Sequence, residues 1–442
     1  MKSSNYYMLA KTMFGLEEIL AKELTMLGAQ NVKILNRAVS FKGDKGFMYK
    51  ANLNLRTALR ILKPIKHFQA YNEQDLYKNI FSIEWYKILR LENTFMTSAT
   101  TKSEDFQHSK YASLVMKDAI VDKFRKKYNS RPNVDTKNPD ISIHLHISKN
   151  TCSVFLDSSG SSLHKRGYKQ KNVLAPINEV LAAGLILKSK WNKKDNFHDP
   201  MCGSGTILIE AALIAYNIPP NIFRKNFSFE KWIDFDEKLW EKIKDKSLDK
   251  EVEYSGIISG SDNCTKSLEI CEHNIQNSLL DDKIKIKKSD FFKEEIKQNT
   301  FVIFNPPYGE RIKIKDKEFY NNIGSTLKHN YLNSEIWIIS ADVENMKYIG
   351  LKPTSKFKVI NSSLECTFRQ YLIYSGSKKQ KKLWIVIQSF FVKILKFYLF
   401  KASSIVIRTP FSVAKINALS NPKFLASFNL LFAFWIWLND PA

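Results

Sequence analysis

The sequence predicts an α/β protein whose C-terminal half is a mostly parallel sheet with helices on both faces, preceded by smaller α+β units. From residue 175 onward, short apolar strands alternate with helices, the pattern of a parallel sheet. Before residue 158, strand and helix patterns are mixed without that regular alternation. The chain has 442 residues, about three times the ~150 residues of one domain, so two or three domains are expected.

Residues 1–60 are predicted to form the first α+β unit. Apolar residues spaced three or four apart define one face of a helix, namely Leu16, Ile19, Leu20, Leu24 and Leu27. Gly28 is placed to end that helix. The stretch from Val32 to Phe41 has strand composition interrupted by polar residues.

Residues 61–157 repeat the α+β pattern. Ala112, Met116, Ala119 and Phe124 mark a helical face, and residues 127–140 are a loop rich in turn formers. Alternating apolar residues on both sides of Lys149-Asn150 predict a β-hairpin. No catalytic cluster stands out, so this part of the chain is interpreted as a binding module.

In the α/β part, residues 175–376, the expected helices and strands alternate along the chain. The helices are expected at 178–191 and 206–217, and the strands at 197–199, 256–262, 283–290, 300–304 and 335–342. Carboxyl ends of parallel strands lie at one edge of a sheet, where such folds bind their ligands.

Charge and cysteine content narrow the function. The chain has 68 Lys and Arg against 44 Asp and Glu, a net charge of +24, which favours a polyanionic partner, RNA or DNA. An AT-biased genome, which enriches Lys without any function, is the competing explanation. Five scattered cysteines argue against a disulfide framework or a zinc site. The cysteine pattern therefore gives no reason to expect a metal. The N-terminus does not resemble a signal peptide, so a cytoplasmic protein is expected.

Residues 158–174 have the small and basic composition of a linker. Lys165, Arg166 and Lys169, with Lys171, are candidates for contacts with RNA phosphates, and Tyr168 for stacking on a base. An ordinary solvated linker explains the composition equally well.

A Gly-rich turn follows the strand that ends at Asp199. Gly203 and Gly205 allow a ligand to lie against the backbone, and the next helix presents free N–H groups there. The third Gly of a dinucleotide-binding fingerprint is replaced by Leu208, and no acidic residue follows at the usual distance of about 20 positions. An NAD enzyme is therefore unexpected.

Two further strand ends carry carboxylates. Asp262 is placed to accept both hydroxyls of a ribose, and Asp290 to accept from an exocyclic adenine amine. Either acid alone is explained as a helix N-cap, but successive acid-bearing strand ends predict a nucleoside-containing ligand.

The strand ending at Phe304 continues into Asn305, Pro306, Pro307 and Tyr308. Two consecutive prolines stiffen the backbone and cannot extend a strand ladder. The Asn carbonyl and a neighbouring backbone carbonyl can hold one planar NH₂ group, which leaves its lone pair free to attack an electrophile. Tyr308 offers a ring on which an extruded base can stack.

Together, DPMCGSGT, SGSDNC, KKSD and NPPYGER resemble class I S-adenosylmethionine-dependent methyltransferases that act on exocyclic base amines. The stretches 156–183 and 198–215, together with GLEEILAKELTMLGA, VSFKG, KDAIVDKF and RPNVD, are similar to the bacterial 23S rRNA guanine-N2 methyltransferases of the large-subunit L type. The resemblance covers residues 1–376. It implies a ferredoxin-like lead domain at 1–60, a THUMP RNA-binding domain at 61–157 and a Rossmann-like methyltransferase domain at 175–376.

The resemblance also implies residue roles. Asp199, Gly203 and Gly205 would surround the methionine end of S-adenosylmethionine, Asp262 its ribose and Asp290 its adenine. The stretch from Asn305 to Tyr308 would hold the target amine of 23S rRNA. Arg311 completes the motif without an evident physical role. His198 is interpreted as a packing residue, and no metal, nucleophilic Cys or obligate protein partner is expected.

Several alternatives stay open. A THUMP methyltransferase acting on tRNA guanine, a DNA adenine-N6 methyltransferase and an RNA-binding assembly factor without activity all fit part of the pattern. Some family members carry a second, guanine-N7 domain, of which this chain shows no motif. The basic and apolar tail, 377–442, resembles nothing in the family. It is interpreted as a membrane-surface segment, a remnant of the second domain or a frame-shifted end, the last two being preferred.

Overall fold

The computed structural model describes residues 5–169, 177–296, 299–307 and 316–374. Residues up to Ile373 form one compact unit. Lys171, Tyr308, Arg311 and the tail, 377–442, lie outside the described residues, so the expectations for them stay predictions. Among the described residues, no helix is both long and apolar enough to cross a membrane.

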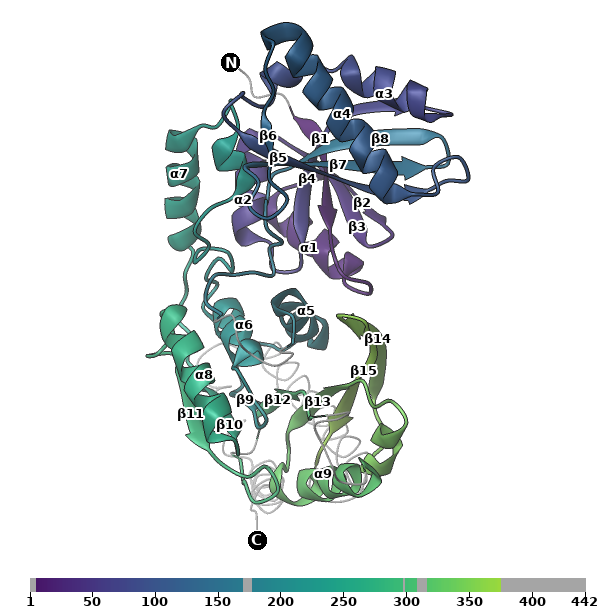
Figure 1. Cartoon of the computed structure of the whole chain (residues 1–442). Helices are drawn as coiled ribbons and strands as arrows, with labels where there is room; N and C mark the ends of the chain where they lie inside the picture. The colour runs from purple at the N-terminus through teal and green to yellow at the C-terminus, as the bar shows by residue number, and fades with distance from the viewer. Residues whose placement is uncertain (1–4, 170–176, 297–298, 308–315, 375–442) are drawn as a thin grey trace, which may run out of the picture. The chain divides into compact units, whose positions relative to one another are not determined.

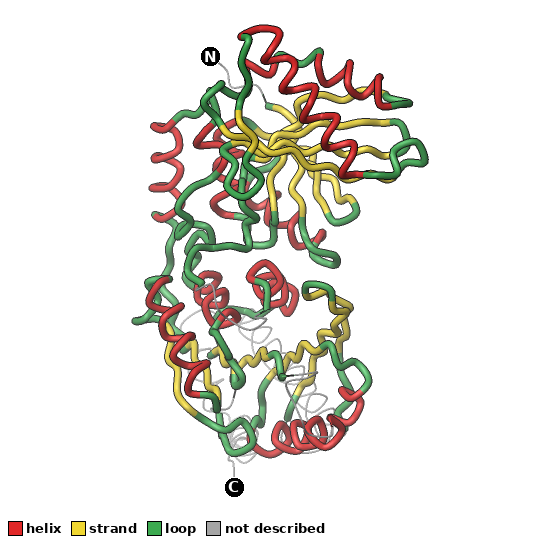
Figure 2. The backbone as a smooth tube through the Cα atoms, in the orientation of Figure 1, coloured by secondary structure: helices red, strands yellow, loops and turns green. Residues whose placement is uncertain are grey.

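The N-terminal part is built on one eight-stranded sheet with the order β2-β3-β1-β4-β8-β7-β5-β6 (Figures 1 and 2). In chain order its elements are β1 (Tyr6–Lys11), α1 (Glu17–Leu27), β2 (Gln30–Leu35), β3 (Ala38–Gly43), α2 (Lys45–Asn54), β4 (Arg60–Gln69), α3 (Glu73–Phe81), a 3₁₀ turn η1 (Trp85–Lys87), β5 (Thr94–Lys102), α4 (Ser109–Tyr128), β6 (Asn133–Val134), β7 (Ile141–Ser148) and β8 (Thr151–Asp157).

Local sequence signals in this part are confirmed. Helix α1 ends at Gly28, whose φ of 102° is the left-handed conformation that glycine adopts without strain. Strands β7 and β8 pair as the expected antiparallel hairpin on either side of Lys149-Asn150. The stretch from Val32 to Phe41 contributes to two strands, because the chain turns between β2 and β3, where Arg37 has a φ of 53°.

The two N-terminal α+β units share this sheet. Strand β4 pairs with β1 on one side and with β8 on the other, both antiparallel. The buried apolar residues of both units accordingly belong to one continuous cluster, which contains Met8 of the first unit and Leu156 of the second. The sheet therefore joins the lead unit to the binding module without a break.

The C-terminal part contains a seven-stranded sheet with the order β11-β10-β9-β12-β13-β15-β14. Its elements are α5 (Glu179–Ser189), β9 (Phe197–Asp199), α6 (Thr206–Ala215), η2 (Ser228–Lys231), α7 (Glu237–Leu248), β10 (Ile258–Asp262), α8 (Thr265–Asn277), β11 (Ile284–Lys288), β12 (Phe301–Phe304), α9 (Asp316–Asn330), β13 (Glu335–Ser340), η4 (Asn345–Ile349), β14 (Ser355–Asn361) and β15 (Leu364–Leu372).

The mostly parallel α/β fold is confirmed. Strands β11, β10, β9, β12 and β13 run parallel, and the β14–β15 pair adds an antiparallel edge. Successive side chains of β12 pack in different hydrophobic clusters. Ile303 packs in the cluster that contains α5 and α6, while Val302 and Phe304 pack in the cluster that contains α9. Helices therefore cover both faces of the sheet, as alternating strands and helices require.

A segment of the C-terminal half completes the N-terminal core. After α6 the chain reaches η2 and α7, and α7 lies against α2. Phe229 stacks on Tyr49 with ring centroids 4.4 Å apart, and Trp240 packs edge-on against both rings. Removing residues 1–160 would therefore expose large aromatic side chains of the remaining chain.

Candidate active site

The acid-bearing strand ends lie at one edge of the seven-stranded sheet. Strand β9 ends at Asp199 and β10 at Asp262, while Asp290 and Asn305 follow β11 and β12. Strand β9 lies between β10 and β12, so the connections diverge to opposite sides at this strand. Open α/β sheets bind ligands in the crevice at such a switch point. The parallel arrangement thus brings the predicted cofactor residues to one edge.

The Gly-rich turn directly follows β9 in the chain. Asp199 is 1% exposed, and its Oδ1 accepts a hydrogen bond from the Met201 N–H at 3.1 Å. Burial raises the pKa of the Asp199 carboxyl well above its usual range, although the Met201 hydrogen bond acts in the opposite direction. Because Asp199 is held by the turn that follows it, its role includes fixing the shape of that turn.

The two glycines of the turn differ in their surroundings. Gly203 has a φ of 53°, and a Cβ added there would meet no atom within 4 Å, so its backbone borders open space. Gly205 has a φ of 77° and caps α6, and a Cβ there would lie 2.5 Å from Cys271 Sγ. Gly203 therefore leaves room for a ligand, whereas Gly205 permits close packing of α8 beneath the turn.

Asp262 ties the turn to the end of β10. Its Oδ2 accepts from the Gly203 N–H at 2.9 Å, and its Oδ1 accepts from the Cys264 N–H at 2.9 Å. Each carboxylate oxygen has two lone pairs, so each retains one for a further donor. The side chain is half-buried and keeps the acceptor capacity that two ribose hydroxyls would need.

Asp290 occupies the corresponding position after β11. It is half-buried, and its Oδ1 accepts from the Phe292 N–H at 3.0 Å. The next residue, Phe291, is buried in the core cluster of α9. Among the described residues, Asp290 Oδ2 takes part in no hydrogen bond, so a carboxylate acceptor remains at this strand end.

Asn305 carries the clearest chemical signal of the site. Among the described residues, its Oδ1 is a buried side-chain oxygen without a hydrogen-bond partner. Leaving a buried acceptor unpaired costs about 1–3 kcal/mol, so this oxygen is a candidate acceptor for a ligand donor. Pro306 is buried and Pro307 is exposed, so the rigid turn passes from the core to the surface.

Glu294 is a functional candidate that the sequence did not reveal. It is 4% exposed and connects three parallel strands: its carboxylate accepts from Ser261 of β10, lies 2.8 Å from Lys287 Nζ of β11 and lies 3.6 Å from His198 Nε2 of β9. Burial raises the pKa of Glu294, but these three partners outweigh burial and hold it at about 2. Glu294 follows β11 without any recognisable motif, so only the folded chain identifies it.

His198 agrees with the packing role expected for it. Its ring is 4% exposed, and Nδ1 lies 2.9 Å from Ser259 Oγ on the adjacent strand. The residue therefore connects β9 to β10 inside the sheet.

The three basic residues predicted to contact RNA phosphates differ in their exposure to solvent. Lys165 is exposed. Lys169 pairs with Glu179 at 3.1 Å and is mostly buried. The expectation for Arg166 is wrong: its side chain is 0% exposed and bonded to Glu210, and Leu163 and Tyr168 on either side of it are buried as well. Tyr168 is likewise fully buried and cannot stack on a base.

The site fits S-adenosylmethionine. The open backbone at Gly203, the spare acceptors of Asp262 and the carboxylate of Asp290 match the groups that the cofactor presents, namely a methionine end, a ribose diol and an adenine amine. Within the described ranges, no cluster of three or more His, Cys, Asp or Glu could hold a metal ion.

Three family models match successive segments of the chain. They describe an RlmL ferredoxin-like domain at residues 7–62, a THUMP domain at 70–157 and an RMKL-like methyltransferase domain at 166–370. The first two matches lie within the N-terminal eight-stranded sheet, and the third covers the C-terminal seven-stranded sheet.

Curated relatives agree with this assignment. A Synechocystis protein, slr0064, provisionally named an RNA methyltransferase, is 38% identical over 81% of this chain and 95% of its own length. The ribosomal RNA large subunit methyltransferase K/L of Buchnera aphidicola is 35% identical over 83% of this chain. The match covers 54% of the Buchnera protein, so this chain corresponds to about half of it.

Solved structures show the same architecture. SMU.472, provisionally named a methyltransferase and solved with SAH, the demethylated form of the cofactor, is 30% identical, with a TM-score of 0.75 over 85% of this chain and 100% of its own. A Listeria monocytogenes protein, named by prediction an N6-adenine-specific DNA methylase, is 28% identical with a TM-score of 0.75 over 84% of this chain and 97% of its own. The chain therefore belongs to the RlmL-like family of THUMP-containing, S-adenosylmethionine-dependent RNA methyltransferases.

Proposed function

We propose that the protein transfers a methyl group to the exocyclic N2 amine of a guanine in 23S rRNA, in the cytoplasm. The observation that carries the proposal is the buried, unpartnered Oδ1 of Asn305 at the end of β12. A planar NH₂ donor supplies the hydrogen bond that this oxygen lacks. The similarity to a ribosomal RNA large subunit methyltransferase supports rRNA as the class of substrate.

We propose separate roles for the cofactor and substrate residues. Asp199, Gly203, Gly205, Asp262 and Asp290 hold the cofactor along the ends of β9, β10 and β11. Asn305 and the carbonyl next to it hold the target amine, and Pro306 and Pro307 keep that acceptor pair rigid. Tyr308 stacks on the extruded base.

Bound S-adenosylmethionine supplies an electrophilic methyl group on a sulfonium. The contribution of the protein is then mainly orientation, which lowers the entropic part of the barrier. Asn305 accepts hydrogen bonds from the amine and so keeps the nitrogen lone pair directed away from its own oxygen. No protein nucleophile is required in a direct displacement.

The substrate is tested with RNA and DNA from a strain lacking this protein. Purified protein and radiolabelled cofactor are incubated with its 23S rRNA, its tRNA and its DNA, and the products are digested and identified by mass spectrometry. N2-methylguanosine formed in 23S rRNA is the expected result. The same nucleoside formed only in tRNA, or N6-methyladenine formed in DNA, would replace the proposed substrate.

The role of Asn305 is tested by Asn305→Ala and by Asn305→Leu, which both remove the acceptor oxygen. Both variants should lose methyl transfer by 100-fold or more, on the order expected when an orienting group is lost, while cofactor affinity changes little. Lys358→Ala, on the antiparallel edge, is a matched control for a change in the same domain. Near-normal turnover of both Asn305 variants would refute the amine-holding role.

A further inference from the structure

Glu294 lies in the turn that carries Asp290, directly after β11. Within this turn the Phe292 N–H donates to Asp290 Oδ1 at 3.0 Å, and the Lys293 N–H donates to the Asp290 carbonyl at 2.9 Å. The side chain of Asn330, at the end of α9, donates to the Glu294 carbonyl at 3.2 Å. The positions of Asp290 and Glu294 are therefore set together.

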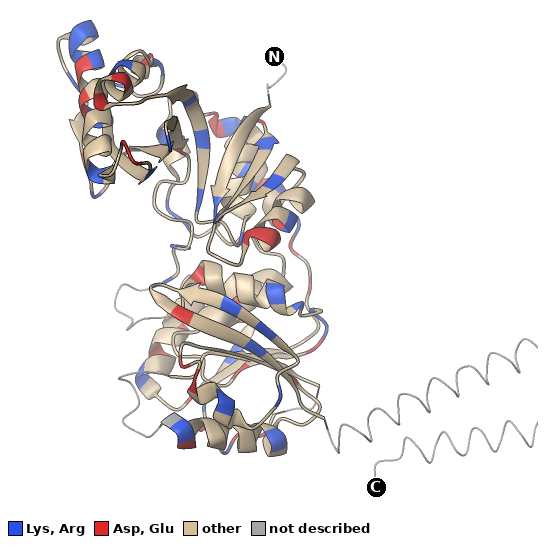
Figure 3. Cartoon of the chain, turned by 90° about the vertical axis from the view of Figure 1, so that its right-hand side faces the viewer, with Lys and Arg blue, Asp and Glu red and all other residues tan. Residues whose placement is uncertain are grey.

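The carboxylate of Glu294 connects three parallel strands at their carboxyl ends. It accepts from Ser261 of β10, lies 2.8 Å from Lys287 Nζ of β11 and lies 3.6 Å from His198 Nε2 of β9. Lys and Arg are spread over both halves of the chain (Figure 3), so a lysine beside an acid does not by itself mark a site. Glu294 differs because it is a buried acid that contacts three strands at once.

The residues that contact this carboxylate alternate along the strands with the proposed cofactor acids. His198 directly precedes Asp199 at the end of β9. Ser261 directly precedes Asp262 at the end of β10. Successive side chains of a strand point to opposite faces of the sheet. His198 pairs in register with Val302, which packs in the α9 cluster, so the carboxylate supports the strand ends from the α9 face.

Stability alone does not explain an acid at this position. Removing an ion from water is costly, and well-packed apolar side chains often replace a buried ion pair without loss of stability. Hydrogen bonds and ion pairs with a carboxylate have preferred distances and directions, which apolar contacts lack. Glu294 can therefore hold the ends of β9, β10 and β11 at defined distances from one another.

The proposed cofactor site depends on such fixed distances. A ligand that contacts Asp199, Asp262 and Asp290 at once extends across the ends of three strands. Binding groups must be held to within about 0.5 Å of their productive positions by the residues behind them. The turn with Asp290 follows a strand at the edge of the sheet, so β10 is its one neighbouring strand. This turn needs an additional connection to the other strand ends.

We propose that Glu294 is a positioning residue for the cofactor, which fixes the turn with Asp290 against the strand ends that carry Asp262 and Asp199. The inference rests on the proposed cofactor roles of these three acids and adds the group that sets their spacing. Glu294 acts through the acids and contacts no atom of the cofactor itself.

The test measures cofactor affinity and stability separately in full-length variants. Isothermal titration calorimetry with S-adenosylmethionine, well below the melting temperature, gives Kd, and thermal unfolding followed by circular dichroism gives Tm. Glu294→Gln keeps the size of the side chain but removes the charge that faces Lys287 and His198. Its Kd should rise roughly tenfold, on the order expected when a residue that orients a ligand-binding group is lost.

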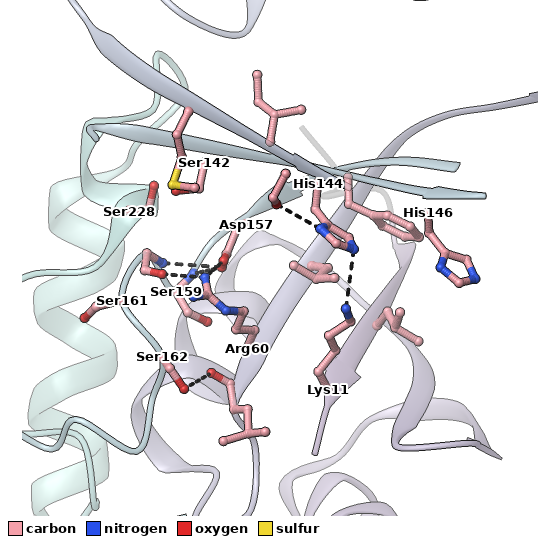
Figure 4. Close-up of a pocket in the computed structure, with 18 of the residues that line it drawn as sticks. Lys11, Arg60, Ser142, His144, His146, Asp157, Ser159, Ser161, Ser162 and Ser228 are labelled. Atoms are coloured by element: carbon pink, nitrogen blue, oxygen red, sulfur yellow. Dashed lines mark hydrogen bonds and ion pairs between the residues drawn. The ribbon is translucent and has the colours of Figure 1, made fainter. Parts of the chain in front are cut away.

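Asp157 provides the matched control, because it is a second buried acid with a basic partner. It lies on the N-terminal sheet, at a pocket away from the cofactor acids, and accepts from Arg60 and from the Ser159 N–H (Figure 4). Asp157→Asn should lower Tm as Glu294→Gln does, but its Kd should stay at the wild-type value. An equal rise of Kd in both variants would show general destabilisation and overturn the inference.

Lys287→Met decides the question if Glu294→Gln does not fold. The Lys287 side chain is 61% exposed, so this variant should fold normally. Its Kd should rise about twofold to fivefold, the range for an exposed ion pair. Lys285→Met, two residues earlier on β11 and also exposed, should bind as wild type does. Equal Kd values for the two lysine variants would then overturn the inference.

A double-mutant cycle with Asp262→Ala tests whether Glu294 acts through the acids. If it does, the double variant loses less affinity than the product of the two single losses, because the two residues are coupled. A loss equal to that product would contradict the positioning role. A weakened Asp262→Ala with an unchanged, folded Glu294→Gln would refute this inference alone. Wild-type affinity in Asp262→Ala would instead refute the proposed cofactor site, and the role of Glu294 with it.

Discussion

Arg166 and Glu210 form a fully buried salt bridge. Arg166 Nε donates to Glu210 Oε1 at 3.1 Å, and both side chains are 0% exposed. Arg166 also donates to the Asn221 side chain at 3.1 Å and to the Arg56 carbonyl, which belongs to the N-terminal part. Glu210 lies on α6, the helix that begins at the Gly-rich turn. The pair therefore connects α6 with the N-terminal part of the chain.

Removing one partner should destabilise the protein strongly. Arg166→Ala leaves Glu210 buried without its partner, which costs about 3–5 kcal/mol. Urea unfolding measures the change. Lys165→Ala, the exposed neighbour, is the control and should stay within about 0.5 kcal/mol of wild type. The double variant Arg166→Met with Glu210→Leu should recover part of the loss, since neither charge of this pair then remains buried. Equal stability of Arg166→Ala and Lys165→Ala would contradict this account.

Glu294 predicts a specific dependence of stability on pH. Its pKa is about 2 in the folded protein against a usual 4.5, so its ionised form stabilises the fold by about 3 kcal/mol above pH 4.5. This contribution is lost as the pH falls from 4.5 toward 2. The difference in unfolding free energy between wild type and Glu294→Gln should therefore be constant near neutrality and shrink by about 1 kcal/mol at pH 3.5.

The exposed neighbour Glu295 supplies the control for this experiment. Glu295→Gln should differ little from wild type at any pH, because an exposed carboxylate interacts weakly. A Glu294→Gln difference that stayed the same between pH 7 and pH 3.5 would show that the carboxylate is not held ionised by Ser261, Lys287 and His198.

Asp262→Ala should weaken cofactor binding by about 1.5–3 kcal/mol, the range for hydrogen bonds to charged groups. The variant loses the proposed ribose acceptor and also the hydrogen bond to the Gly203 N–H. Isothermal titration calorimetry with S-adenosylmethionine measures the effect, and circular dichroism verifies the fold. Asp281→Ala, an exposed change before β11, should bind normally. Unchanged affinity in a folded Asp262→Ala protein would remove the ribose assignment.

Signals that depend on neighbouring residues were sufficient to predict much of the molecule. The αL glycine after α1 and the turn at Lys149-Asn150 follow from backbone preferences that act within a few positions. The strand-end residues Asp199 and Asp262 could be grouped because parallel strands necessarily share a carboxyl edge. The sequence by itself therefore determined the mostly parallel sheet, the order of the domains and the gathering of the strand-end acids at one edge, where we propose the site.

Only the tertiary structure showed which polar and aromatic residues are buried and with which distant residues they pair. Arg166 lies in a basic segment and has the residue type of a phosphate contact. In the folded chain it is buried, because it pairs with Glu210, 44 positions away. Lys11 meets His144 across 133 positions, and Phe229 stacks on Tyr49 although it lies in the other half of the chain. Residue type and spacing describe only local preferences, whereas burial and pairing depend on which distant segments the two sheets bring together.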